Sequence, residues 1–150
     1  MNTYKFFLEL HSGFRYIVLV LLLLAIIMAW AGWLGKKSFS EGQRKLNLFT
    51  LISVHTQLLI GLVLYFLSPF VQFNSQTMKD DTTRYWTVEH EFLMIIALAL
   101  VHVGRVRIRK SAAPASKHRA AAIFVGVAML LVLLGIPWPG WANGRPLLRW

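Results

Sequence analysis

The chain of 150 residues is 57% hydrophobic and only 15% charged, and it contains no cysteine. Its length predicts a single domain, 1–150, and its apolar residues lie in four long blocks that need lipid around them, because so short a chain has no core large enough to cover them. The missing cysteines exclude disulfides, cysteine-ligated zinc, iron–sulfur clusters and covalently attached haem. The formal net charge of +10 lies at the ends of the blocks and not in a separate basic domain, which argues against nucleic-acid binding.

In chain order, the apolar runs predict spans at about 10–34, 47–70, 86–106 and 119–137. A spanning helix needs about 20 residues to cross about 30 Å of hydrocarbon, so each run is long enough. None of the runs shows the alternation of a membrane β-strand. The sequence therefore predicts an all-α integral membrane protein, a four-helix transmembrane bundle.

The segment 138–150 follows Pro137 and is expected to form an interfacial C-terminal tail. Its tryptophans, Trp138, Trp141 and Trp150, are typical of the belt at a membrane–water interface. We expect this tail to serve as an anchor or a contact surface, without a chemical role.

The charges of the connecting segments predict the orientation of the bundle. The first and third connections carry four and six basic residues, against one acid and none, whereas the second balances two basic residues with two acids. The positive-inside rule then places the first and third connections in the cytoplasm and both termini on the outer, periplasmic side. The expected location is the bacterial inner membrane, crossed several times.

Two histidines lie at the same depth near the predicted outer face. His11 is six residues beyond Lys5, and His90 is six residues beyond Arg84. At 1.5 Å per residue, both lie about 9 Å inside the outer polar boundary. Ionisable side chains in membrane spans are costly and usually functional. Two imidazoles at one depth on different helices suit the two axial positions of a haem iron, so this is the first candidate ligand pair.

A second pair is expected nearer the cytoplasmic face. His102 follows His90 by twelve residues, about 18 Å along the helix and about 120° around it, so it faces a different neighbour. His55 on the second span is its natural partner, although the depths of the two differ by about one to two helical turns. Zinc suits these residues less well, because they are too far apart along their helices for one tetrahedral cluster.

Two arginines extend the pattern. Arg15 lies one turn beyond His11 and needs an anionic partner, for which haem propionates, Glu89 and Glu91 are all candidates. Arg105 could face propionates at the inner pair or reach the headgroups. His118, at the start of the fourth span, is expected to be interfacial. For each of the histidines, a hydrogen bond between helices remains an alternative to ligation.

Four segments resemble small four-helix bacterial membrane proteins labelled as b-type cytochromes. They are 11–16 (HSGFRY), 55–61 (HTQLLIG), 88–90 (VEH) and 135–139 (GIPWP), and the resemblance covers nearly the whole chain. The plan is also similar to that of bacterial cytochrome b561, a four-helix dihaem protein linked to quinol. In that family the first two helices supply one ligand each and a later helix supplies two.

Carried over to this chain, the resemblance implies that His11 and His55 are the single ligands and that His90 and His102 are the double. The double lies on the third helix here, whereas it lies on the fourth in cytochrome b561. The expected function is electron transfer by one or two bis-histidine haem b groups, by a protein that is more an electron carrier than a stand-alone enzyme.

The expected partners are the lipid bilayer, a quinol or quinone, and other subunits of a respiratory complex or a second copy of the chain. A cofactor-free accessory subunit of a larger respiratory or transport complex is the main alternative. A small transporter or proton conduit built on Glu89, His90 and Arg15 is the third.

Overall fold

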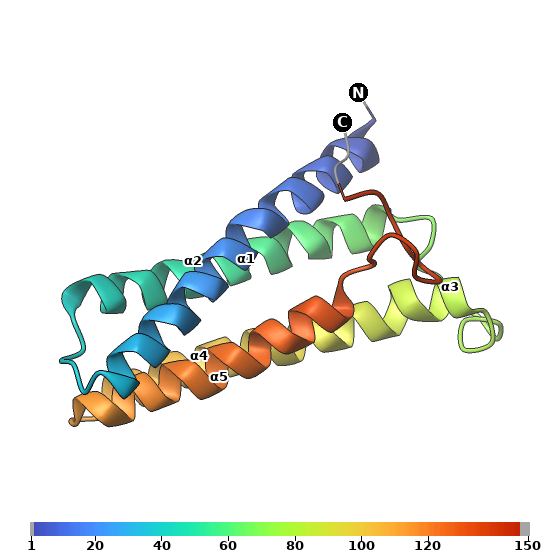
Figure 1. The fold of residues 1–150 in the computed structure, drawn as a ribbon. Coiled ribbons are helices and arrows are strands. Elements are labelled where there is room, and N and C mark those ends of the chain that lie inside the picture. The colour runs from blue at the N-terminus through green and yellow to red at the C-terminus, as the bar shows by residue number, and fades with distance from the viewer. Residues whose placement is uncertain (1, 148–150) are drawn as a thin grey trace.

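The computed structural model describes residues 2–147, in which four long helices run up and down in chain order (Figure 1). No strand occurs among these residues. The prediction of an all-α fold is therefore confirmed. The four long helices are α1 (Thr3–Leu34), α2 (Glu41–Leu67), α4 (His90–Lys110) and α5 (Pro114–Gly135). A turn of helix, α3 (Asp81–Arg84), and a π-helical segment, η1 (Tyr85–Glu89), lead into α4 with helical backbone at each junction.

Three of the helices, α1, α2 and α5, are long and apolar enough to cross a membrane. The third expected span, 86–106, contains most of α4, which is not among them. This helix is apolar only between Phe92 and Gly104, because Glu91 precedes that stretch and Arg105 follows it. The membrane character of the chain is therefore carried by α1, α2 and α5.

The second helix starts earlier than its apolar run. Ser40 accepts a hydrogen bond from the Gln43 backbone N–H (3.2 Å), and the Gln43 side chain accepts one from the Ser40 N–H (3.0 Å). This capping box satisfies two backbone donors that would otherwise lack partners, so the polar residues before Leu48 are helical as well.

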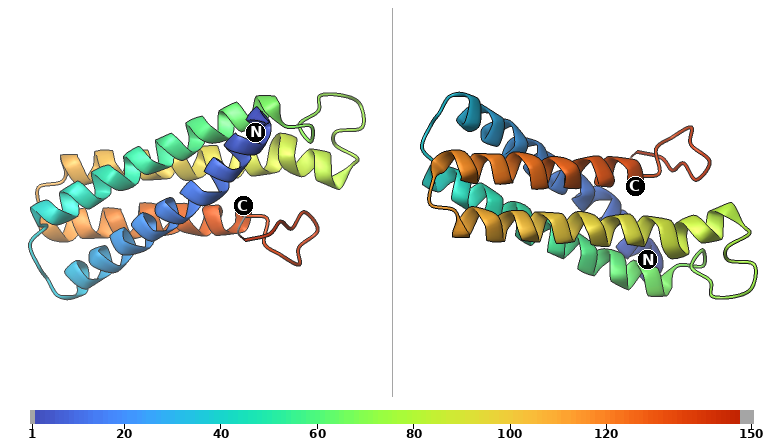
Figure 2. Two further views of the ribbon diagram at one scale, coloured as in Figure 1. Left: turned by 90° about the horizontal axis from the view of Figure 1, so that it is seen from above. Right: turned by 90° about the horizontal axis from the view of Figure 1, so that it is seen from below.

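The bundle has two distinct ends. The basic-loop end carries the α1–α2 and α4–α5 connections, and the termini end carries the start of α1, the α2–α3 connection and the tail 136–147 (Figure 1). In Figure 2, α4 and α5 lie side by side along their length, whereas α1 crosses the bundle diagonally. Since α1 packs mainly against α2 and α5, the space between α1 and α4 at the termini end is bridged by side chains.

Small residues line the contacts between the helices. On the buried face of α5, Val125, Ala128 and Val132 belong to a central cluster with Leu22 of α1, and Ala121 belongs to a second cluster with Ala29 of α1. Alanine lets helix backbones approach closely, which is how helices pack in lipid, where the hydrophobic effect does not drive them together.

Large apolar side chains remain on the outside along the whole bundle. Leu34, Phe66 and Phe73, for example, are each more than 70% exposed, at 76%, 78% and 80%. A water-soluble monomer rarely exposes apolar surface on this scale. The surface suits a protein surrounded by lipid.

The tail folds back over the termini end. Helix α5 ends at Gly135, ahead of Pro137, and the Trp138 Nε1–H donates to the Leu133 carbonyl (2.8 Å). The tail then returns to the first helix, where the carbonyl of Leu147 accepts a hydrogen bond from the Tyr16 hydroxyl (2.6 Å). Trp150, which was expected in the interfacial belt, lies outside the described residues.

Candidate functional site

His90 is held in a defined orientation at the start of α4. Its Nδ1 lies 2.7 Å from the carbonyl oxygen of Gly135, which can only accept, so Nδ1 carries the proton. The Tyr85 hydroxyl donates to the same carbonyl (2.8 Å). Gly135 is the last residue of α5, where helix carbonyls have no partner within the helix. In the neutral ring, the other nitrogen of His90, Nε2, therefore carries a lone pair. Metal-binding histidines are usually oriented in this way, by a hydrogen bond from the nitrogen that does not bind the metal.

His11 of α1 faces His90 across the bundle. The two ring centroids are 6.3 Å apart, with an interplanar angle of 68°. An imidazole nitrogen binds a first-row metal ion at about 2.0 Å and lies about 1.1 Å from its own ring centre, so two imidazoles on opposite sides of one ion have centroids about 6 Å apart. The structure therefore brings together the first pair predicted from the sequence, at a spacing that such an ion could bridge.

The surroundings of His11 fit a binding role. Its Nδ1 is buried and has no hydrogen-bond partner, a costly state that calls for an explanation. Its ring lies directly on Gly61 of α2, where an added Cβ would come within 3.0 Å of the His11 Cε1 atom. Any larger residue at position 61 would push the ring out of place.

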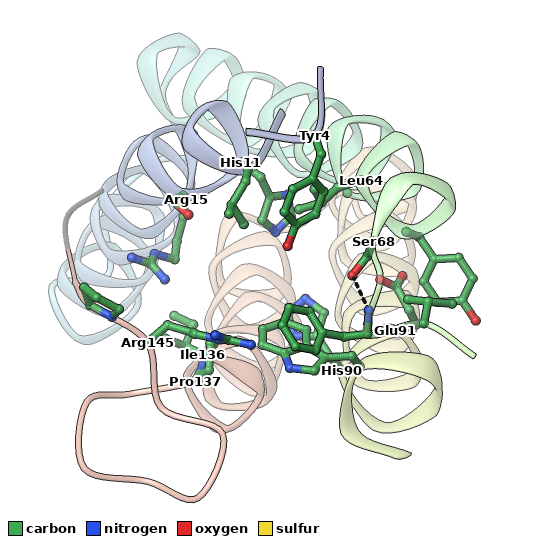
Figure 3. A pocket seen from close by; sticks show the side chains of 18 residues that line it. Tyr4, His11, Arg15, Leu64, Ser68, His90, Glu91, Ile136, Pro137 and Arg145 are labelled. Carbon is green, nitrogen blue, oxygen red and sulfur yellow. Dashed lines mark hydrogen bonds between the residues drawn. The ribbon is translucent and has the colours of Figure 1, made fainter. Parts of the chain in front are cut away.

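Two cavities flank the histidine pair, one toward the termini end, which Figure 3 shows, and one toward the middle of the bundle. The lining of the second cavity is mainly apolar but includes Arg15, Glu91 and Gln57. The Gln57 Nε2 donates to the His11 carbonyl (2.9 Å), while its Oε1 is buried without a partner in the described residues. Both cavities are bordered by the same six residues, His11, Arg15, Gly61, His90, Glu91 and Ile136. The site is thus a slot divided by the two imidazoles.

The charged neighbours are not paired as the sequence had suggested. Arg15 donates to the Leu147 carbonyl (2.9 Å) and to the Tyr16 hydroxyl (3.1 Å), and forms no ion pair within the described residues. Glu89 instead pairs with Arg84, at 2.6 Å. Glu91 borders both cavities and likewise lacks an ion-pair partner in the described part of the chain. An Arg15–glutamate pair is therefore not formed in this structure.

The second predicted pair is also brought together, but in a different setting. The ring centroids of His55 and His102 are 6.1 Å apart, and the Nδ1 of His55 donates to the Leu51 carbonyl (2.8 Å). His55 is partly exposed and His102 is exposed, on the face shared by α2 and α4. The spacing of this second pair matches that of the first pair, but the second pair is more exposed.

The two remaining candidates have structural partners. Arg105 donates to the Arg44 carbonyl (2.9 Å) and so ties α4 to the first turns of α2. His118, expected at the interface, is completely buried at the basic-loop end. Its Nε2 lies 3.1 Å from the Lys37 carbonyl oxygen, and its Nδ1 lies 3.4 Å from the Gln43 amide nitrogen. His118 joins α5 to the α1–α2 connection and lines neither cavity.

Two residues of the site, Trp86 and Arg145, were missed by the sequence reasoning. Trp86 precedes His90 by four positions, a spacing that places both on one helix face, and its buried Nε1–H has no partner. Arg145 reaches the first cavity from the tail. The helical spacing of Trp86 was a usable signal, whereas nothing in the sequence linked position 145 to the first helix.

Within residues 2–147, no group of three or more histidine, aspartate and glutamate side chains could hold a metal ion. Histidine pairs are what the bundle offers. A scan against protein-family models and searches of curated proteins and of solved structures found no match to this chain.

Proposed function

We propose that this chain is a membrane b-type cytochrome, in which His11 and His90 are the axial ligands of a haem b. The observation that carries the proposal is the facing pair of imidazoles, 6.3 Å apart, with cavities on both sides. Held by these two imidazoles, a haem would supply one-electron transfer.

The residues present fit such a group. Nδ1 of His90 is fixed by Gly135, so the ring turns its other nitrogen to the slot. Gly61 provides a surface with no side chain beneath His11, and most of the residues that line the second cavity are apolar. Helix α1 packs mainly against α2 and α5, so few helix contacts between α1 and α4 occupy the space on either side of the histidine pair.

His55 and His102 are proposed as a second ligand pair, on the strength of their 6.1 Å spacing. Their exposure would place a second macrocycle against lipid or a partner subunit.

We further propose that the bundle lies in a bacterial inner membrane with its basic loops inside, and that a quinol supplies the electrons. The charge distribution of the connections and the mainly apolar second cavity support these assignments.

A reduced-minus-oxidised absorbance spectrum of the detergent-purified protein, with pyridine haemochrome quantification, tests the proposal. Low-spin b-type bands with one haem per chain are expected from the His11–His90 pair alone, and two haems if His55 and His102 also ligate. A colourless protein, after expression with ample haem, would refute the proposal. It would favour a cofactor-free accessory subunit, in which the imidazoles are contacts between helices.

A further inference from the structure

Two arginines from opposite ends of the chain line the cavity that contains the His11–His90 pair. Arg15 comes from the middle of α1, and Arg145 comes from the tail (Figure 3). The tail reaches this position because Leu147 is bonded to Arg15 and Tyr16, and because the Arg145 N–H donates to the Pro137 carbonyl (3.0 Å).

Within residues 2–147, neither guanidinium has an ion-pair partner. Arg145 lies over the rings of Phe70 (4.6 Å to the centroid) and Trp86 (5.5 Å), and Arg15 is bonded to a carbonyl and a hydroxyl. Aromatic faces and carbonyls stabilise a cation but do not cancel its charge. Two like charges that line one cavity repel each other, so an anion bound between them would be favoured.

The same cavity holds a donor without an acceptor. The Nε1–H of Trp86 is buried, lines the cavity and has no hydrogen-bond partner. Glu91 is the sole carboxylate among the residues lining this cavity, and it pairs with neither arginine. The cavity therefore presents an excess of positive charge and of N–H groups, which suits a ligand with carboxylates.

We infer that Arg15 and Arg145 form a receptor for the two carboxylates of the bound macrocycle, with Trp86 as an additional donor. This inference rests on the proposed function, and it assigns the tail a binding role in place of the purely interfacial one expected from its sequence. Guanidinium–carboxylate bonds are among the strongest hydrogen bonds in proteins, so they would select a macrocycle that carries free acids.

The test compares two macrocycles that differ only at the carboxylates. Iron protoporphyrin IX and its dimethyl ester are titrated into apoprotein in detergent, with the Soret band as the readout. The wild type is expected to bind the diacid at least tenfold more tightly, since one hydrogen bond to a charged group contributes about 1.5–3 kcal/mol. Arg145→Gln should weaken diacid binding by about tenfold and leave ester binding unchanged, and Arg145→Lys should fall between the two.

Arg107→Gln is the matched control, because it removes one exposed positive charge from the basic-loop end of α4. It should leave both affinities unchanged. Equal affinity for diacid and ester in the wild type would overturn the inference while leaving the cytochrome assignment intact. So would an equal loss for both macrocycles in Arg145→Gln. If neither macrocycle binds to the wild type, the proposed function and this inference are both refuted.

Discussion

Each end of the bundle encloses a histidine, but the hydrogen-bond partners of the ring nitrogens differ between the two ends. At the basic-loop end, His118 has a partner near each ring nitrogen and packs against Phe39 and Gly32. At the termini end, His11 has a buried Nδ1 without a partner and borders two cavities. Burial alone therefore does not mark a ligand-binding histidine. An unpaired ring nitrogen beside open space supports the ligand role proposed for His11, because the described residues leave that nitrogen without a hydrogen-bond partner.

The largest expected effect is on haem content, when a histidine is replaced at one end of the bundle and then at the other. His90→Ala should abolish the low-spin haem spectrum, because it removes one of the two proposed ligands of the enclosed pair. His118→Ala should retain the haem content per folded chain, since His118 is remote from both cavities. Purified variants are compared by haemochrome content and helical circular dichroism. An undiminished low-spin spectrum in His90→Ala would remove that residue from the site.

His118→Ala should instead show its effect in stability. The substitution leaves the Lys37 carbonyl and the Gln43 amide short of a partner and opens a cavity among α1, α2 and α5. A loss of about 2–4 kcal/mol is expected for the combined change. Denaturant unfolding of the cofactor-free protein in detergent measures it, and a loss below about 0.5 kcal/mol would show that this histidine is a surface residue in solution.

A pair of glycine substitutions sharpens the comparison. A Cβ at Gly32 would collide with the ring of His118, so Gly32→Ala should cost about 1–3 kcal/mol by overpacking. A Cβ at Gly61 would reach only the Cε1 edge of His11, at 3.0 Å, so Gly61→Ala should tilt that ring and reduce haem content with a smaller loss of stability. If both substitutions change stability and haem content to a similar extent, the two glycines do not have the different roles proposed for the two ends.

The smallest effect concerns pH and lies outside the helices that enclose the site. Hydrogen bonds from the side chain and backbone of Thr83 hold the pKa of Asp80 below its ordinary value of 3.8. Since the folded pKa is depressed, this cap stabilises α3 above the ordinary pKa and is lost as pH falls through the lower, folded value. An NMR titration of the Thr83 amide should show this transition, and Asp80→Asn should remove it.

The sequence predicted the four helices and both histidine pairs because each depends on a regular repeat. Apolar runs bounded by charges indicated the helices, and counting residues from those charges placed His11 level with His90. The same count left His55 and His102 about one to two helical turns apart in depth, whereas the structure brings their ring centroids to 6.1 Å. Sequence periodicity has this power only where the chain continues in one regular conformation.

The rest depends on contacts between distant segments. The burial of His118 follows from the way the α1–α2 connection closes over α5, and the surroundings of Arg15 follow from the return of the tail to α1. Glu89 was wrongly considered for Arg15, because its position on the helix gave no sign that Arg84 would hold it. No local sequence pattern specifies such contacts between distant segments of the chain.

The return of the tail to the first helix also sets an order of events in biosynthesis. Arg15 and Leu147 are 132 positions apart in the chain, so Arg15 is translated long before its partner. The cavity that Arg15 and Arg145 line cannot close until the chain has been translated through the tail 136–147. Any ligand of this cavity is therefore acquired only after the tail has been made, and a variant truncated before Arg145 would lack the segment that completes the cavity.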